Sequence, residues 1–239
     1  MKILALDSSA KTASAAIIKD KKLIAEFFVN AGLTHSQTLA LLVDSVIKSV
    51  NITPEEINCF AVSSGPGSFT GIRIGIALVK GIAFAVNKPC VGVSTLEAIA
   101  YNHIEKNAFI CSVMDARCNQ VYNANFVSNN GKMERLCDDR AILIEDLKHE
   151  LLNVSNKYDK IILTGDGAEP CYTYMPDIKE IILADNIKRF QRASSVGFLA
   201  LKELNQNNTV NAEELVPFYL RLPQAERELN NKLKLIKGE

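Results

Sequence analysis

The sequence predicts an α/β protein made of two similar subdomains, each with a mixed sheet and flanking helices. Two repeated features carry this prediction. A short apolar strand ends at Asp7, and a second one ends at Asp115, 108 residues later. Glycine-rich loops follow another buried strand in each half, at Gly65 and Gly165, 100 residues apart. This spacing indicates a duplicated unit, and a cleft between two such units is the default place for a ligand.

The first half is expected to begin with three strands before any helix. Short apolar runs separated by polar turns are typical of strands, and apolar residues every three or four positions are typical of a helix. Thr34 and Gln37 fit a capping box at the start of the first helix. The expected elements are strands at 3–6, 12–18, 23–29, 57–62 and 91–93, helices at 34–50, 72–86 and 94–103, and a glycine-rich loop at 63–71.

The second half repeats that order. Its expected elements are strands at 109–114, 121–127, 132–137, 161–163 and 181–183, helices at 143–152 and 194–204, and a glycine loop at 164–167. We therefore divide the chain into an N-terminal subdomain at 1–104, a smaller one at 105–192, and a C-terminal helix and tail at 193–239 that pack back on the body.

Composition and charge narrow the classes of function. Lys plus Arg and Asp plus Glu both number 27, so the chain lacks the basic excess of proteins that bind nucleic acid by themselves. The apolar run at 3–6 is too short for a signal peptide, and helix 72–86 is too short for a membrane span. The six cysteines form no C-x-x-C pair, which favours reduced, buried thiols. We expect a cytoplasmic protein that does not associate with membranes.

The two aspartates lie where proteins of the actin, sugar kinase and Hsp70 group bind phosphate and metal. In a working site the aspartate positions Mg²⁺ and backbone amides hold the phosphates. Here neither aspartate is followed by glycine, so turn stabilisation is the favoured interpretation. The residues that correspond to such loops, expected to be vestigial, are Asp7, Ser8, Ser9, Gly165 and Gly167.

The loop at 65–67 is not a Walker loop, because no Gly-Lys-Ser/Thr follows it. It either presents a helix N-terminus to an anion or forms a tight turn capped by Ser68 or Thr70, which is the favoured interpretation. His35 has Leu39, not a second histidine, one helical turn later, and no Gly-x-Ser-x-Gly occurs. The residues themselves therefore predict no catalytic residue and no metal ligand.

Six segments together resemble the bacterial TsaB (YeaZ) family. They are 4–9 (LALDSS), 34–36 (THS), 64–75 (SGPGSFTGIRIG), 114–117 (MDAR), 165–167 (GDG) and 217–221 (PFYLR). The resemblance extends over nearly the whole chain, and segment 64–75 is the most specific. It implies two tandem actin-like (ASKHA, RNase H-like) subdomains. It also implies a scaffold or activator in the synthesis of N6-threonylcarbamoyladenosine (t6A) at position 37 of ANN-decoding tRNAs.

In that system the resemblance assigns catalysis to a paralogue, TsaD, which holds a metal with an H-x-x-x-H pair. It further implies a TsaE-like ATPase partner, a homodimer when the chain is alone, and contact with tRNA only through the complex. The isolated chain is expected to hold no cofactor, while a nucleotide at a partner interface stays open. Leu39, which stands where the second histidine of such a pair would be, agrees with the interpretation that this chain does not hold the metal.

Helix 72–86 is apolar on more sides than one sheet needs, and its glycines let another backbone approach. Leu41 lies off the core stripe of the helix at 34–50. We expect these two helices to pack on the same pair of a partner; the alternative is that helix 72–86 is central in its own subdomain. The residues expected at this interface are Leu41, Ile72, Arg73, Gly75, Ile76, Val79, Lys80 and Ala83.

Three other functions are kept as alternatives. One is a nucleotide-binding or nucleotide-hydrolysing enzyme of the same fold that acts alone, and another is a peptidase, which no nucleophile–base pair supports. The third is direct tRNA contact by basic residues of the tail, against which stands a solvated amphipathic helix. The tail residues concerned are Arg221, Arg227, Lys232, Lys234 and Lys237.

Overall fold

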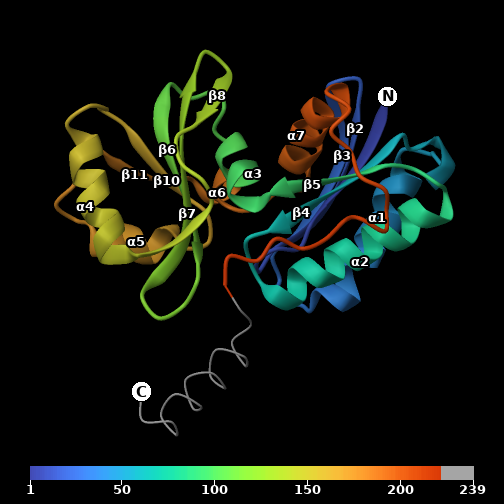
Figure 1. The fold of residues 1–239 in the computed structure, drawn as a ribbon, viewed down its shortest axis with the longest axis horizontal. Coiled ribbons are helices and arrows are strands. Elements are labelled where there is room, and N and C mark those ends of the chain that lie inside the picture. The colour runs from blue at the N-terminus through green and yellow to red at the C-terminus, as the bar shows by residue number, and fades with distance from the viewer. Residues whose placement is uncertain (222–239) are drawn as a thin grey trace, which may run out of the picture.

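A computed structural model describes residues 1–221, which form two α/β subdomains that lie side by side (Figure 1). The first subdomain has a five-stranded mixed sheet in the order β3-β2-β1-β4-β5. Strand β2 is antiparallel to both of its neighbours, β1 and β3, whereas β4 and β5 run parallel to β1. Its strands are β1 (Lys2–Asp7), β2 (Ala13–Lys19), β3 (Lys22–Val29), β4 (Cys59–Gly65) and β5 (Cys90–Ser94).

Alternation along these strands gives the first sheet two apolar faces. Leu4, Leu6 and Phe60 face the core under helices α1 (His35–Ser49) and α2 (Phe69–Ala85). Ile3 and Ala5 face the opposite core, under helix α7 (Ala193–Asn205). The sheet is therefore covered on both sides, which is why its central strands are continuous apolar runs.

The second subdomain repeats the first. Its sheet has the order β11-β10-β6-β7-β8, with β9 also paired to β7. Taken from the other end, this is the order of the first sheet with each strand replaced by its counterpart, so the predicted duplication is confirmed. Its elements are β6 (Ala108–Asp115), β7 (Gln120–Asn129), β8 (Lys132–Arg135), β9 (Arg140–Leu143), α4 (Ile144–Ser155), β10 (Ile161–Thr164), α5 (Ala168–Tyr174), β11 (Ile181–Leu183) and α6 (Asn186–Arg189).

Helices α3 and α7 connect the two halves. Helix α3 (Thr95–Tyr101) places Leu96 and Ile99 in a core with Ile110 and Phe126 of the second sheet. Its Ala98 instead packs in the core beneath α7, on the first sheet. A boundary at residue 104 therefore separates α3 from the residues of the second sheet that it packs on. Helix α7 follows the second subdomain in the sequence but covers the sheet of the first.

The observed elements differ from the sequence prediction in a few places. The Thr34 capping box is wrong: no side-chain cap is formed there, and the Gln37 amide instead donates to the Thr34 carbonyl. Ser68 and Ser94 do cap their helices through Oγ. Elements β9, α5 and α6 were not predicted, because they are short and lack periodicity. The tail beyond residue 221, including its expected packing and tRNA contacts, lies outside the described residues.

Candidate functional site

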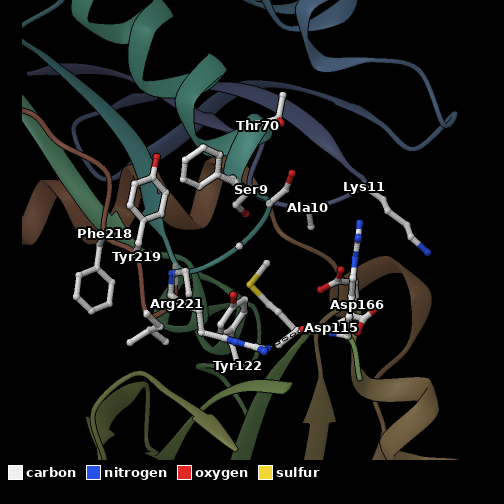
Figure 2. Close-up of a pocket in the computed structure, with 18 residues that line it drawn as sticks. Ser9, Ala10, Lys11, Thr70, Asp115, Tyr122, Asp166, Phe218, Tyr219 and Arg221 are labelled. Carbon is white, nitrogen blue, oxygen red and sulfur yellow. Dashed lines mark hydrogen bonds between the residues drawn. The ribbon is translucent and has the colours of Figure 1, made fainter. Parts of the chain in front are cut away.

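A cleft of about 450 Å³ opens between the two subdomains (Figure 2). Loops that follow β1, β4, β6 and β10 form its walls, together with the C-terminal segment. Among the residues of the expected vestigial phosphate loops, only Ser9 lines it. The lining residues with polar or aromatic side chains are Ser9, Lys11, Ser68, Phe69, Thr70, Asp115, Arg117, Tyr122, Asp166, Phe218, Tyr219 and Arg221.

Asp7 turns away from the cleft and into the protein. Its carboxylate is fully buried and accepts hydrogen bonds from the Ser9 amide (3.0 Å), the Ser9 hydroxyl (2.9 Å) and the Ser63 hydroxyl. Burial raises the pKa of Asp7, although these hydrogen bonds lower it. Since its oxygens are occupied by the chain's own donors, Asp7 stabilises the turn after β1.

Asp115 and Asp166 lie close together at one end of the cleft, and Lys11 reaches toward the same end (Figure 2). Asp115 accepts a hydrogen bond of 2.7 Å from the Arg117 amide, so it too supports a turn. The pKa of Asp166 is raised to about 6, chiefly by burial and to a smaller extent by the charge of Asp115, although a hydrogen bond from Gln191 lowers it. The buried carboxyl of Asp166 is therefore the electrostatically perturbed group at this end of the cleft.

The loop glycines serve close backbone packing. A Cβ at Gly165 (φ +107°) would overlap the Val113 carbonyl oxygen, and one at Gly167 would lie 2.9 Å from the Met114 carbonyl carbon. These glycines therefore let the loop after β10 lie against β6. Their presence is explained by the fold without any bound phosphate.

His35 does not fit a metal site. Its Nε2 donates to the Ala10 carbonyl oxygen at 2.6 Å, and its Nδ1 is buried without a hydrogen-bond partner among residues 1–221. Leu39, one turn further along α1, is fully buried in the first core. No group of three or more His, Cys, Asp or Glu side chains within residues 1–221 is placed to hold a metal ion. His35 thus ties the start of α1 to the turn after β1.

The residues expected at a partner interface divide into two groups. Five of them are buried inside the chain and cannot offer side-chain surface to another protein, so the expectation is corrected for Ile72, Gly75, Ile76, Val79 and Ala83. The reason is that α2 is central in its own subdomain on this side. A Cβ at Gly75 would lie 2.5 Å from the Ser8 hydroxyl, so the backbone that approaches this glycine is the chain's own.

Arg73 and Lys80 lie on a flank of α2 that the C-terminal segment already contacts. Arg73 Nε donates to the Tyr219 hydroxyl at 2.8 Å, and Lys80 Nζ donates to the carbonyl oxygens of Glu213 and Leu215 at 3.0 and 3.2 Å. Only Leu41, with 66% of its surface exposed, offers the apolar surface that the sequence predicted.

The structure also leaves apolar residues of α1 and α2 in solvent that the sequence did not single out. Phe84 is 66% exposed. Gly81, three residues earlier on α2, is also exposed, and no atom lies within 4 Å of where its Cβ would be. Both helices contact each other and cover the same face of the first sheet. We call the exposed small and apolar residues of these helices the α1–α2 apolar face: Ala40, Leu41, Ala77, Gly81, Phe84 and Ala85.

The sheet order, the duplication and the cleft define a tandem actin-like protein of the ASKHA class. A family model described as TsaD, tRNA N6-adenosine threonylcarbamoyltransferase, matches residues 29–229, and the chain belongs to this family, in its TsaB (YeaZ) branch.

Two relatives match almost end to end. The chain is 28% identical to the tRNA threonylcarbamoyladenosine biosynthesis protein TsaB of Bacillus subtilis, over 95% of this chain and 96% of the relative. It is 29% identical to the Escherichia coli protein of the same name, over 97% of this chain and 100% of the relative. YeaZ from Pseudomonas aeruginosa has the same fold, with a TM-score of 0.77 and 24% identity over 92% of this chain and 99% of that one.

None of the helices described within residues 1–221 is both long and apolar enough to cross a membrane.

Proposed function

We propose that this chain is a non-catalytic subunit that pairs with a TsaD-like threonylcarbamoyltransferase to make t6A at position 37 of ANN-decoding tRNAs. The family and the near full-length TsaB relatives support the pathway. The observation that carries the non-catalytic role is at α1. There the second position of an H-x-x-x-H pair is the buried Leu39, while His35 Nδ1 is buried and its Nε2 donates to the Ala10 carbonyl.

The paralogue docks on the α1–α2 apolar face in this proposal. Leu41 and Phe84 are each 66% exposed, although apolar side chains of this size are usually buried. Gly81 has no atom within 4 Å of where its Cβ would lie, so a partner helix can approach the backbone there. Arg73 lies at the rim, where its hydrogen bond to Tyr219 holds it in place.

The same face serves a homodimer when the paralogue is absent, because an exposed apolar surface is removed from water by either partner. A TsaE-like ATPase joins the assembled pair, and tRNA is contacted through the complex. The neutral balance of 27 basic and 27 acidic residues supports an indirect role at the tRNA.

Reconstitution tests this function. The chain, its TsaD-like paralogue and a TsaE-like ATPase are incubated with an ANN-decoding tRNA, threonine, bicarbonate, ATP and the enzyme that makes threonylcarbamoyl-adenylate, and t6A is measured in the digested tRNA. We expect t6A only when both the chain and its paralogue are present. Product from the chain without the paralogue would contradict the proposal.

A His35→Gln variant separates the scaffold from an enzyme. Glutamine keeps a donor that reaches toward the Ala10 carbonyl but is a poor metal ligand. We expect the reconstituted rate to stay within about fivefold of the wild-type rate, since a neutral hydrogen bond is worth about 1 kcal/mol. A collapse of the rate with an intact heterodimer would instead place the metal on this chain.

A further inference from the structure

The C-terminal segment Pro217–Arg221 crosses the mouth of the cleft and contacts both subdomains. In Figure 1 it follows α2 toward the space between the two sheets, and in Figure 2 Tyr219 points toward the first subdomain while Arg221 reaches toward the second, on the side of Asp115. Neither the t6A reaction nor the docking face accounts for this placement.

On the first subdomain the segment is held by backbone and aromatic contacts. The Phe218 amide donates to the Ser64 carbonyl at 2.8 Å, and the Tyr219 ring stacks on Phe69 with centroids 4.7 Å apart. Gly65 has φ +133°, and a Cβ there would overlap the Phe218 carbonyl oxygen. The segment therefore packs directly against the backbone of Gly65, the last residue of β4.

On the α2 side, Arg73 completes a stack of three side chains. Its guanidinium lies 3.8 Å from the centre of the Phe69 ring, and its Nε donates to the Tyr219 hydroxyl at 2.8 Å. The cation therefore joins the helix to the segment through its hydrogen bond to Tyr219, while its contact with Phe69 of the same helix holds it in place.

On the second subdomain one side chain makes the contact. Arg221 Nη1 donates to the Ala116 carbonyl oxygen at 2.8 Å, in the turn between β6 and β7. That turn is conformationally costly, because Arg117, Cys118 and Asn119 all have positive φ. A charge-assisted bond to its first carbonyl stabilises a backbone shape that the local sequence disfavours.

We propose that residues 217–221 are an internal clasp that fixes the orientation of the two subdomains by joining α2 and the end of β4 to the β6–β7 turn. The clasp joins the two walls of the cleft, as a bound ligand joins the walls of a cleft that closes on it. It also connects the helix that carries Phe84 to the second subdomain.

Hydrogen–deuterium exchange of the full chain tests the clasp. The amides to follow are those of Ala116 and Gln120, which bond within the β6–β7 turn, and that of Phe218. In Arg221→Ala we expect the two turn amides to exchange about tenfold faster, as for loss of one hydrogen bond from a charged donor. In Tyr219→Ala we expect the same acceleration at the turn together with faster exchange at Phe218.

Two controls keep the test specific. Val216→Ala alters the side chain directly before the segment, which is 64% exposed and does not line the cleft, so its exchange should match the wild type. Arg221→Lys keeps a charged donor and should restore most of the protection at the turn. Thermal unfolding of each variant establishes that the fold is retained.

The clasp is overturned if Arg221→Ala exchanges at the turn like Val216→Ala. It is also overturned if Tyr219→Ala accelerates exchange at Phe218 alone, because the segment would then belong to the first subdomain and would not join the two.

Discussion

Truncating Phe84 to alanine should weaken binding to the TsaD-like paralogue without destabilising the chain. Phe84 is 66% exposed, and an aromatic side chain presents about 200 Å², so about 130 Å² is available for burial by a partner. At about 25 cal/mol per Å² this area is worth about 3 kcal/mol when it is fully covered. Alanine keeps the β-carbon, so the dissociation constant should rise roughly 10- to 100-fold.

The assay is calorimetric titration of the purified chain with the paralogue. Ile187→Ala is the matched control, because Ile187 is 77% exposed but lies on α6 of the second subdomain. Both variants should unfold at the wild-type temperature, as is usual for exposed positions. An unchanged dissociation constant for Phe84→Ala, with the fold intact, would refute docking on the α1–α2 apolar face. Ile76→Glu is unsuitable for this test, because Ile76 is only 4% exposed and a buried charge there would disrupt the core.

Three other changes test the structural argument. Gly75→Ala should lower the free energy of unfolding by about 1–3 kcal/mol, because its Cβ would lie 2.5 Å from the Ser8 hydroxyl. Gly81→Ala in the same helix should raise the free energy of unfolding by about 0.5–1 kcal/mol, because nothing lies within 4 Å of its Cβ. Equal effects of the two variants in denaturant titrations would count against this packing. Asp166→Asn should match the wild-type stability near pH 3 and exceed it by about 3 kcal/mol above pH 6. The sign follows from the raised pKa of about 6, because the folded wild type loses stability as the pH rises from the unfolded value of 3.8 to the folded one; a pH-independent difference between the two proteins would contradict it. His35→Ala should cost about 1 kcal/mol in the same titrations through loss of the bond to the Ala10 carbonyl, and no loss would show that this contact is dispensable.

The sequence determined the architecture because the fold depends on patterns that repeat along the chain. Apolar runs that end at Asp7 and Asp115 predicted two equivalent central strands, and the two sheets indeed have the same order. Ser68 or Thr70 was predicted as a cap at the glycine-rich loop, and Ser68 caps α2, since capping depends on a residue and the amide three positions later. The shortest elements were missed because a few residues are too few to show a period.

The sequence also predicted that Leu41 lies off the buried stripe, and that α2 is apolar on more than one side. It did not determine which side of α2 stays in solvent. Ile76 and Phe84 are both large and apolar, yet one is 4% exposed and the other 66%, because the first sheet and the C-terminal segment cover only part of the helix.

Tertiary structure alone decided what the cleft contains. Asp7 has the sequence position of a metal-binding carboxylate, but Ser63, 56 residues away, donates to it and keeps it inside the protein. Arg221 is far from Ala116 in the sequence. Only the path of the chain around both subdomains brings Arg221 Nη1 to 2.8 Å from the Ala116 carbonyl oxygen. Local patterns fix strands, helices and caps, whereas contacts between distant segments depend on how the two sheets pack, which no local pattern records.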